Sequence, residues 1–401
     1  MPDAQVFTSD VVVVGGCGHV GLPLAIAFAD RGLRTHIYDI DPGAVDRVRR
    51  GSMPFYEAGA EEPLRRALAN GMLEVSSDVS TVEGAENVVV VIGTPVDEHL
   101  NPDPSAVRAA ILDCEAYLSD GQLLVLRSTV YPGVTQSIEQ MIDALGRDID
   151  VAFCPERIAQ GAAMVELSAL PQIVGVRTER AGERAEALFR VLTESVLRVT
   201  PEEAELAKLF TNTWRYIKFA IANQFFMMAN DYGLDFQRIR DVIRADYPRA
   251  ADLPGAGFAA GPCLLKDTMQ LAAFTNNSFV LGHSAMLVNE GLPLYLVSRL
   301  ERRFDLAETT VGILGMAFKA ETDDTRDSLA YKLRRILRFR ARDVLCADDR
   351  VSADPTLLPL EDVLDRADVL VIAAPHPEYR GLSTTKPVVD IWNMRGEGTV
   401  V

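Results

Sequence analysis

A short stretch near the middle of the chain, GFAAGPCLLKDT (residues 257–268), places a cysteine close to a lysine and an aspartate. Free cysteine is usually a buried apolar residue, but a thiolate beside a positive charge is a nucleophile. Lys266 supplies such a charge, and Asp267 can orient water or a base. A thiolate captures an aldehyde as a thiohemiacetal, and loss of a second hydride gives a thioester that water cleaves. Cys263 is therefore either a packing residue or a covalent nucleophile.

Two polar residues interrupt a long apolar pattern between residues 201 and 233, PEEAELAKLFTNTWRYIKFAIANQFFMMANDYG. Its periodicity predicts one helix of about 30 residues, ending near Gly233. Lys208 and Asn212 are four residues apart, so they share a face of that helix. An isolated lysine and asparagine would usually lie on the solvent-exposed edge of a helix. On a helix that is otherwise so apolar, they could instead be donors to an oxyanion.

A glycine pattern follows the first apolar run. In VVVVGGCGHVG (residues 11–21), Gly16, Gly18 and Gly21 form GxGxxG between a predicted strand and a predicted helix. Asp39 ends the next predicted strand, where an acid binds the ribose hydroxyls of NAD and repels the 2′-phosphate of NADP. We therefore expect NAD, the alternative being a glycine turn without a cofactor. The predicted cofactor residues within the turn also include His19 and Val20.

Further polar residues stand at predicted strand ends, where ligands bind in open parallel sheets. Thr94 and Pro95 end one apolar run, Thr129 follows a second and Glu156 a third. Each could equally be a helix cap or a turn residue.

The alternation of apolar runs with amphipathic stretches predicts an α/β protein with doubly wound parallel sheets. This alternation continues to about residue 199, where the long helix begins, and it resumes at TTVGILGMAF (residues 309–318). We expect two Rossmann-like domains joined by the long central helix and a helical middle domain. The expected boundaries are 1–199, 200–303 and 304–401.

Composition describes a globular chain of 401 residues, with 48% hydrophobic and 24% charged residues. The net charge of -17 opposes non-specific attraction to nucleic acid or an anionic membrane. Five scattered cysteines and five unclustered histidines predict neither a disulfide framework nor a metal site. With no signal pattern and no apolar run of about 18 residues, we expect a cytoplasmic protein.

Several motifs together resemble the nucleotide-sugar 6-dehydrogenases, the UDP-glucose and GDP-mannose dehydrogenase family. Besides the glycine turn they are GSMPFYEAG, IGTP, STVYPG, CPERIAQG, AELAKLFTNT, GPCLLKDT and GMAFKAETDDTRDS. The resemblance implies an NAD-binding Rossmann domain, a long helix that forms a homodimer, and a C-terminal domain that binds UDP. It also implies the four-electron oxidation of the C6 hydroxyl of a UDP-hexose to the uronic acid.

The same resemblance assigns roles by position. Cys263 becomes the nucleophile, Lys208 and Asn212 the donors to the C6 oxyanion, and Asp267 the residue that positions Lys208 or a water. Glu156 and Thr129 become the acid/base and the water-positioning residue of thioester hydrolysis.

The implied binding residues extend over all three segments. Arg249 is expected to reach the neighbouring subunit's sugar, and Lys266 is expected near the cofactor. Phe318 and Lys319 are expected to contact uridine and diphosphate. The other residues implied to bind substrate are Arg157, Ile158, Gly257 and Arg326, together with Glu156, Lys208 and Asn212.

The chain departs from the family pattern at two places. Gln160 replaces a second glutamate found in many members, and AAGP replaces the usual Gly-Gly before the cysteine, which would narrow backbone freedom there. CPERIAQG is similar to UDP-N-acetylmannosamine dehydrogenases and LLKD to the UDP-glucose type, so the sugar stays open. Two other functions also stay open: a two-electron hydroxy-acid dehydrogenase and a catalytically silent NAD-binding protein.

Overall fold

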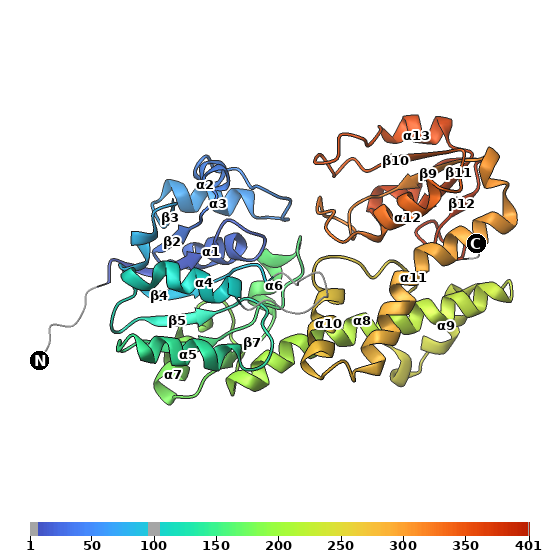
Figure 1. Ribbon diagram of the computed structural model, residues 1–401. Helices are drawn as coiled ribbons and strands as arrows, with labels where there is room; N and C mark the ends of the chain where they lie inside the picture. The colour runs from blue at the N-terminus through green and yellow to red at the C-terminus, as the bar shows by residue number, and fades with distance from the viewer. Residues whose placement is uncertain (1–6, 95–104, 400) are drawn as a thin grey trace, which may run out of the picture. The chain divides into compact units, whose positions relative to one another are not determined.

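The computed structural model describes residues 7–94, 105–399 and 401, and it contains two units, Met1–Phe210 and Thr211–Val401 (Figure 1). Strand β1 (Ser9–Val14) shows why the first unit is a doubly wound sheet. Val11 and Val13 pack in one core with helix α1 (Gly21–Asp30), and Val12 and Val14 pack in a second core on the other face. A strand buried on both faces is typical of a parallel sheet covered by helices.

The sheet of the first unit has eight strands in the order β3-β2-β1-β4-β5-β6-β7-β8. All neighbours are parallel except β6 and β7, which meet through a single antiparallel pair. The order reverses between β1 and β4, where open α/β sheets bind ligands. The remaining strands are β2 (Thr35–Tyr38), β3 (Leu73–Ser76), β4 (Ala85–Val90), β5 (Leu123–Leu126), β6 (Asp150–Phe153), β7 (Gln172–Gly175) and β8 (Val196–Val199).

Seven helices and two short 3₁₀ turns belong to the described residues that connect these strands. Besides α1, the helices are α2 (Pro42–Arg49), α3 (Glu61–Ala69), α4 (Ser105–Cys114), α5 (Val134–Ala144), α6 (Ala163–Ala169) and α7 (Glu179–Arg190). The 3₁₀ turns are η1 (Val79–Val82) and η2 (Glu115–Tyr117).

The predicted long helix is α8 (Pro201–Asp231), with 31 residues. It begins in the first unit and continues into the second. The second unit adds α9 (Phe236–Arg244), α10 (Leu264–Phe274) and α11 (Val280–Arg303). Within the described ranges, no helix is both long enough and apolar enough to cross a membrane.

A four-stranded parallel sheet ordered β10-β9-β11-β12 completes the second unit. The strands β9 and β11 are buried throughout and pack against α12 and α13. The predicted α/β class with two Rossmann-like sheets and a helical middle is therefore confirmed. The elements are β9 (Thr310–Leu314), α12 (Leu329–Leu337), β10 (Asp343–Ala347), α13 (Leu360–Arg366), β11 (Val369–Ile372) and β12 (Val388–Val389), with turns η3 (Pro248–Ala250), η4 (Leu306–Glu308) and η5 (Pro377–Gly381).

Candidate active site

The glycine turn after β1 has the shape that a pyrophosphate needs. A Cβ on Gly16 would lie 2.8 Å from the carbonyl oxygen of Val13, and one on Gly21 would lie 2.7 Å from the Cα of Gly16. A Cβ on Gly18 would find no protein atom closer than 3.8 Å. Packing therefore demands the first and third glycines, whereas the exposed middle glycine leaves room for a ligand over the start of α1.

Asp39 stands at the end of β2, beside that turn. Its Oδ2 accepts a hydrogen bond from the backbone N–H of Cys17 (2.9 Å), and its Oδ1 accepts one from the N–H of Asp41 (3.0 Å). The carboxylate is only partly buried. An acid held in this way can still accept hydrogen bonds from ribose hydroxyls.

His19, within the turn, connects it to two other family motifs. Its ring centroid lies 4.0 Å from that of Phe55, and Nδ1 lies 2.9 Å from Nε2 of Gln160. Glu57 is buried and accepts hydrogen bonds from the backbone N–H groups of Gly161 (2.8 Å) and Ala163 (2.7 Å). The sequence analysis missed Glu57, which joins GSMPFYEAG to the start of α6.

The strand ends that follow β4 and β5 lie at the same edge of the sheet as the glycine turn, because these strands are parallel neighbours of β1. Thr94 and Thr129 are both partly buried there, as is Val20 in the turn. Pro95 lies outside the described residues. The structure thus gathers the described cofactor residues of the first unit at one edge.

Glu156 follows β6, and both of its carboxylate oxygens accept hydrogen bonds. Oε2 accepts hydrogen bonds from Nε (3.0 Å) and Nη2 of Arg127, and Oε1 accepts them from the backbone N–H groups of Arg157 (2.7 Å) and Ile158 (3.0 Å). Glu156 and Arg127 are 6% and 2% exposed. Sequence reasoning missed Arg127, which also donates to the carbonyl oxygen of Cys154 (3.0 Å). To accept a proton, Glu156 would have to release one of these donors.

The neighbours of Glu156 are also constrained. The guanidinium of Arg157 donates to the carbonyl oxygen of Pro171, and burial lowers the pKa of Arg157. Ile158 packs against the apolar core that contains α1. Both predicted substrate residues are thus held by the first unit itself.

Glu205 on α8 fixes the segment that contains Thr129 and the start of α5. It is fully buried and accepts hydrogen bonds from the N–H of Gly133 (2.8 Å) and from the N–H (2.8 Å) and hydroxyl (2.6 Å) of Thr135. Burial raises the pKa of Glu205, although these hydrogen bonds oppose the shift. Lys208 follows three residues later and is 8% exposed. Sequence reasoning missed Glu205.

Asn212, one turn beyond Lys208, contacts the first turn of α10. Its Nδ2 donates to Oδ2 of Asp267 at 2.5 Å, and both residues are buried. Lys266 Nζ lies 3.1 Å from the other carboxylate oxygen. The described partners of Asp267 are thus Asn212 and Lys266. Since an amide nitrogen has two protons, Asn212 keeps one for another acceptor.

Cys263 differs from the other cysteines. All five lie in the described part of the chain, and Cys263 alone is exposed. Burial raises the pKa of Cys17 and Cys154 to about 12 and that of Cys114 and Cys346 to about 11, so these thiols stay protonated near neutral pH. Cys263 precedes α10 at its N-terminal end, where the helix dipole favours a thiolate.

Arg326 supplies a positive charge to this region. Asp324 accepts from its Nε (3.0 Å) and Nη2 (2.6 Å), and this hydrogen bonding raises the pKa of Arg326, with a smaller contribution from the charge of Cys263. Gly261 has φ +99°, and a Cβ there would lie 2.4 Å from the ring of Phe318. The segment before Cys263 therefore packs closely on the loop that contains both Phe318 and Arg326.

The AAGP substitution does not strain the backbone. Ala259 and Ala260 are absent from the described non-glycine residues with positive φ, whereas Gly261 occupies the left-handed region. The position that needs glycine still has it, and the expected narrowing of backbone freedom near Cys263 stays a prediction.

Both backbone polar groups of Gly257 are hydrogen-bonded to one side chain of the long helix α8. Its N–H donates to Oδ1 of Asn223 (2.9 Å), and its carbonyl oxygen accepts from Nδ2 of the same side chain (3.0 Å). A Cβ on Gly257 would lie 2.1 Å from the ring of Trp392. A cavity of about 340 Å³ adjoins this segment, lined by Gly255, Ala256, Trp392, Asn393, Phe219, Gln237 and Arg240.

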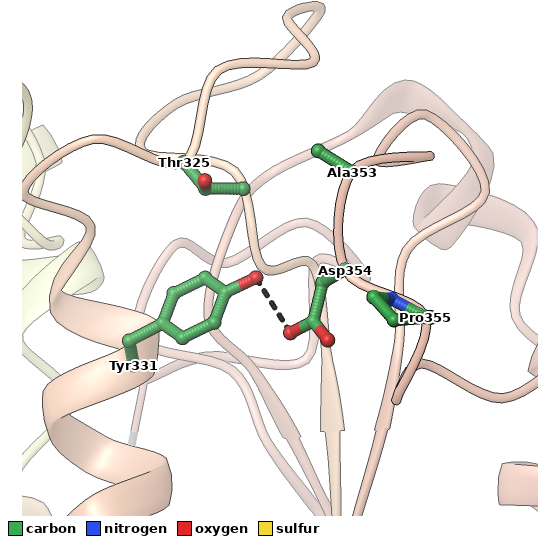
Figure 2. Close-up of a pocket in the computed structure, with 5 residues that line it drawn as sticks. All are labelled: Thr325, Tyr331, Ala353, Asp354 and Pro355. Carbon is green, nitrogen blue, oxygen red and sulfur yellow. Dashed lines mark hydrogen bonds between the residues drawn. The ribbon is translucent and has the colours of Figure 1, made fainter.

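A second cavity, of about 270 Å³, lies beside α12 (Figure 2). In it, the hydroxyl of Tyr331 donates to Oδ2 of Asp354 (3.0 Å), which also accepts from Nη1 of Arg334 (3.1 Å). The tyrosine and the aspartate of its lining are therefore already hydrogen-bonded to each other, which argues for a structural role.

The last two predicted binding residues are accessible. Lys319 is partly exposed, with Nζ 5.9 Å from the centroid of the Phe318 ring. Arg249 in η3 is exposed, and Nη1 lies 3.4 Å from the hydroxyl of Tyr247. An exposed guanidinium of this kind can bind a group outside its own chain.

Comparisons with known proteins agree with this architecture. Three family models match: the NAD binding domain of the UDP-glucose/GDP-mannose dehydrogenase family at residues 10–193, its central domain at 202–290 and its UDP binding domain at 312–396. The UDP-N-acetyl-D-mannosamine dehydrogenase of Pyrococcus horikoshii is 31% identical over 384 residues, covering 93% of this chain and 91% of the relative. The NDP-N-acetyl-D-galactosaminuronic acid dehydrogenase of Ralstonia solanacearum is 30% identical over 399 residues, covering 94% and 93%.

A solved structure of a UDP-glucose dehydrogenase from the hyperthermophilic archaeon Pyrobaculum islandicum superposes with a TM-score of 0.88 and 29% identity, covering 100% of this chain and 99% of the other. These matches favour nucleotide-sugar oxidation over the hydroxy-acid and silent alternatives. The chain belongs to the UDP-glucose/GDP-mannose dehydrogenase family and is an NAD-dependent nucleotide-sugar dehydrogenase.

Proposed function

We propose that this enzyme oxidises the C6 hydroxyl of UDP-N-acetyl-D-mannosamine to the uronic acid, with Cys263 as covalent nucleophile. The observation that carries the proposal is the exposed thiol of Cys263 at the start of α10, where Asp267 in the first turn of the same helix accepts a hydrogen bond from Asn212 of α8. The sugar rests on the relatives from Pyrococcus horikoshii and Yersinia pestis, both named UDP-N-acetyl-D-mannosamine dehydrogenase.

The first unit fits NAD. Gly18 leaves space at the start of α1, and Asp39 has a partly exposed carboxylate beside it. Thr94 and Thr129 stand at the adjacent strand ends. When bound, NAD accepts one hydride in each of the two oxidations.

The residues of this chain have three tasks in the proposed reaction. The thiolate of Cys263 adds to C6 of the aldehyde, and the resulting oxyanion accepts hydrogen bonds from the ammonium of Lys208 and the free amide proton of Asn212. After the second oxidation C6 is a thioester. A water ordered by Thr129 adds to it while Glu156 takes a proton, the C–S bond breaks, and the thiolate leaves as the uronate forms, with the second proton released to solvent.

Substrate and stoichiometry test the proposal together. The purified enzyme is given UDP-N-acetyl-D-mannosamine, UDP-glucose, UDP-N-acetyl-D-glucosamine or GDP-mannose, and NADH absorbance is recorded. We expect two NADH per UDP-N-acetyl-D-mannosamine. One NADH per substrate would support the two-electron alternative, and none with any nucleotide sugar the silent one. Cys263→Ser should stop uronate formation and keep UDP binding, and undiminished uronate formation would exclude the covalent route.

The proposed assembly is a homodimer formed through α8. Large apolar side chains, exposed by 40 to 56%, follow one stripe of this helix: Trp214, Ile221, Phe225 and Met228. Their spacings of seven, four and three residues keep them on one face. An exposed apolar stripe of this length is typical of a subunit interface. The dimer would present Arg249 to the partner's substrate.

Sedimentation equilibrium tests the dimer. Phe225→Glu places a charge within the stripe and should give monomers, whereas Gln224→Glu, at the exposed neighbouring position, should leave the dimer intact. A dimer that persists in the first variant would place the interface elsewhere.

Two further proposals follow from the sequence. The domain boundaries are proposed at 1–199, 200–303 and 304–401, in keeping with the three matched family segments. A cytoplasmic location is proposed because all five cysteines are free, as expected in a reducing compartment.

A further inference from the structure

The loop of residues 315–321, which contains Phe318 and Lys319, is tied down at both ends by buried side chains. Near its start, the N–H groups of two consecutive residues donate to Oδ2 of Asp348, at 2.6 and 2.9 Å. At its end, the N–H of Glu321 donates to Nδ1 of His376, at 3.2 Å. Asp348 is 4% exposed and His376 is 0% exposed.

The two ties are themselves connected. Nε2 of His376 lies 3.2 Å from Oδ2 of Asp348. A backbone N–H can only donate, so Nδ1 of His376 must present its lone pair to Glu321. The proton of the neutral ring then resides on Nε2 and is donated to Asp348. The hydrogen-bond network therefore selects one neutral tautomer of His376.

The acid that this ring contacts is favoured in its ionised form. Burial raises the pKa of Asp348, but the hydrogen bond from His376 and the backbone N–H groups outweigh it and lower that pKa. The titratable and charged groups around the ring are Asp348, Asp349 and Arg350 after β10, Glu378 and Tyr379 in η5, and Glu321 in the loop.

The first unit has an acid at the position equivalent to Asp348, but in a more exposed environment. Asp39 and Asp348 both follow the second strand of their sheet and both accept hydrogen bonds from the turn after the first strand. Asp39 is partly exposed, whereas Asp348 is covered by His376. The equivalent carboxylate of the second unit is therefore not accessible to a ribose.

We propose that His376, which contacts no substrate in this scheme, is a positioning residue for the nucleotide-sugar site: its neutral ring fixes the loop of residues 315–321 and thereby places Phe318 and Lys319 against uridine and diphosphate. The inference rests on the proposed function of these two residues. A loop that keeps its binding conformation only a tenth of the time binds about tenfold more weakly.

Two variants of the full-length enzyme separate positioning from folding. His376→Asn keeps an acceptor near the place of Nδ1 but does not titrate, and His376→Leu has no acceptor. Glu378→Gln is the matched control, since it breaks the adjacent ion pair with Arg350 and leaves the loop ties intact. NAD affinity, measured by calorimetry, reports the integrity of each variant.

We expect His376→Leu to raise the Kd for UDP at pH 8 and the KM for the nucleotide sugar about tenfold, with kcat and NAD affinity close to wild type. His376→Asn, which keeps an acceptor near the place of Nδ1, should bind UDP more tightly than His376→Leu.

The outcomes are distinguishable. Wild-type enzyme that binds no UDP overturns the proposed function and this inference with it. Wild-type enzyme that binds UDP, with an equal Kd in His376→Leu, overturns the inference alone. It is also overturned if His376→Asn binds UDP no more tightly than His376→Leu.

Discussion

Arg127→Met should destabilise the first unit more than any surface substitution, because it leaves a carboxylate buried without its cation. Arg127 donates to Glu156, to the carbonyl oxygen of Cys154 and to Gln172 (3.1 Å), and its guanidinium lies 4.8 Å from the centroid of the Phe189 ring. Removing one partner of a buried ion pair costs about 3–5 kcal/mol. Methionine retains part of the side-chain volume, so the loss reports mainly the unpaired charge.

The assay is urea unfolding, with the transition of the first unit identified by its shift when NAD is added. Arg127→Met should lower the free energy of unfolding of that transition by about 3–5 kcal/mol at pH 8. Adding Glu156→Gln to the variant should recover ~2 kcal/mol, as for other residues in contact.

Equal unfolding free energies of Arg127→Met and Arg127→Met/Glu156→Gln at pH 8 would refute this prediction. Such equality would mean that the charge of Glu156 costs nothing without Arg127, and that the two backbone N–H groups on its Oε1 suffice.

Three shorter predictions address other parts of the site. Asn212→Ala should lower kcat by about 10²–10³ with little change in KM, as for loss of one oxyanion donor, and a decrease below tenfold in steady-state assays would remove Asn212 from that role. Gly261→Ala should raise the KM for the nucleotide sugar because its Cβ would displace Phe318, whereas Ala260→Gly should not; equal KM values would contradict the packing argument. Burial raises the pKa of Asp354, but hydrogen bonds, first from Thr356, outweigh it and lower that pKa to about 2. A carboxyl with a depressed pKa stabilises the fold above its unfolded value, about 3.9, and loses this contribution as the pH falls through about 2. Asp354→Asn should therefore cost about 2 kcal/mol at neutral pH and progressively less as the pH falls toward 2 in urea unfolding; a cost independent of pH would refute it.

Sequence patterns were sufficient where the physics is local. Four consecutive valines predicted β1, and the apolar period that begins at Pro201 predicted α8 to within a few residues. They were insufficient for β3 and β8, because LEVS and VLRV place charged residues within short edge strands. Those strands form because the sheet supplies a hydrogen-bonded neighbour, which no window of the sequence contains.

The candidate site divides in the same way. Residues that would touch a ligand were found from motif and spacing, whereas the residues that hold them, Arg127, Glu57 and Glu205, were not. Their hydrogen bonds span 29, 106 and 70 positions of the chain, so only the folded sheet reveals them. Asn223 is an exception that spacing could have found. It lies 11 residues after Asn212, which is about three helical turns, so both amides share one face of α8.

The paired acids Asp39 and Asp348 show why a repeated fold does not imply a repeated ligand. The two sheets place a carboxylate at equivalent strand ends and use it to hold the adjacent turn. In the first unit the turn has an open glycine and the acid remains accessible, which suits a dinucleotide. In the second unit His376 lies beside the acid and both side chains are buried, so this carboxylate is not accessible to a ribose. One histidine from the segment after β11 is thus enough to make the equivalent acid of the same topology unavailable to a ligand.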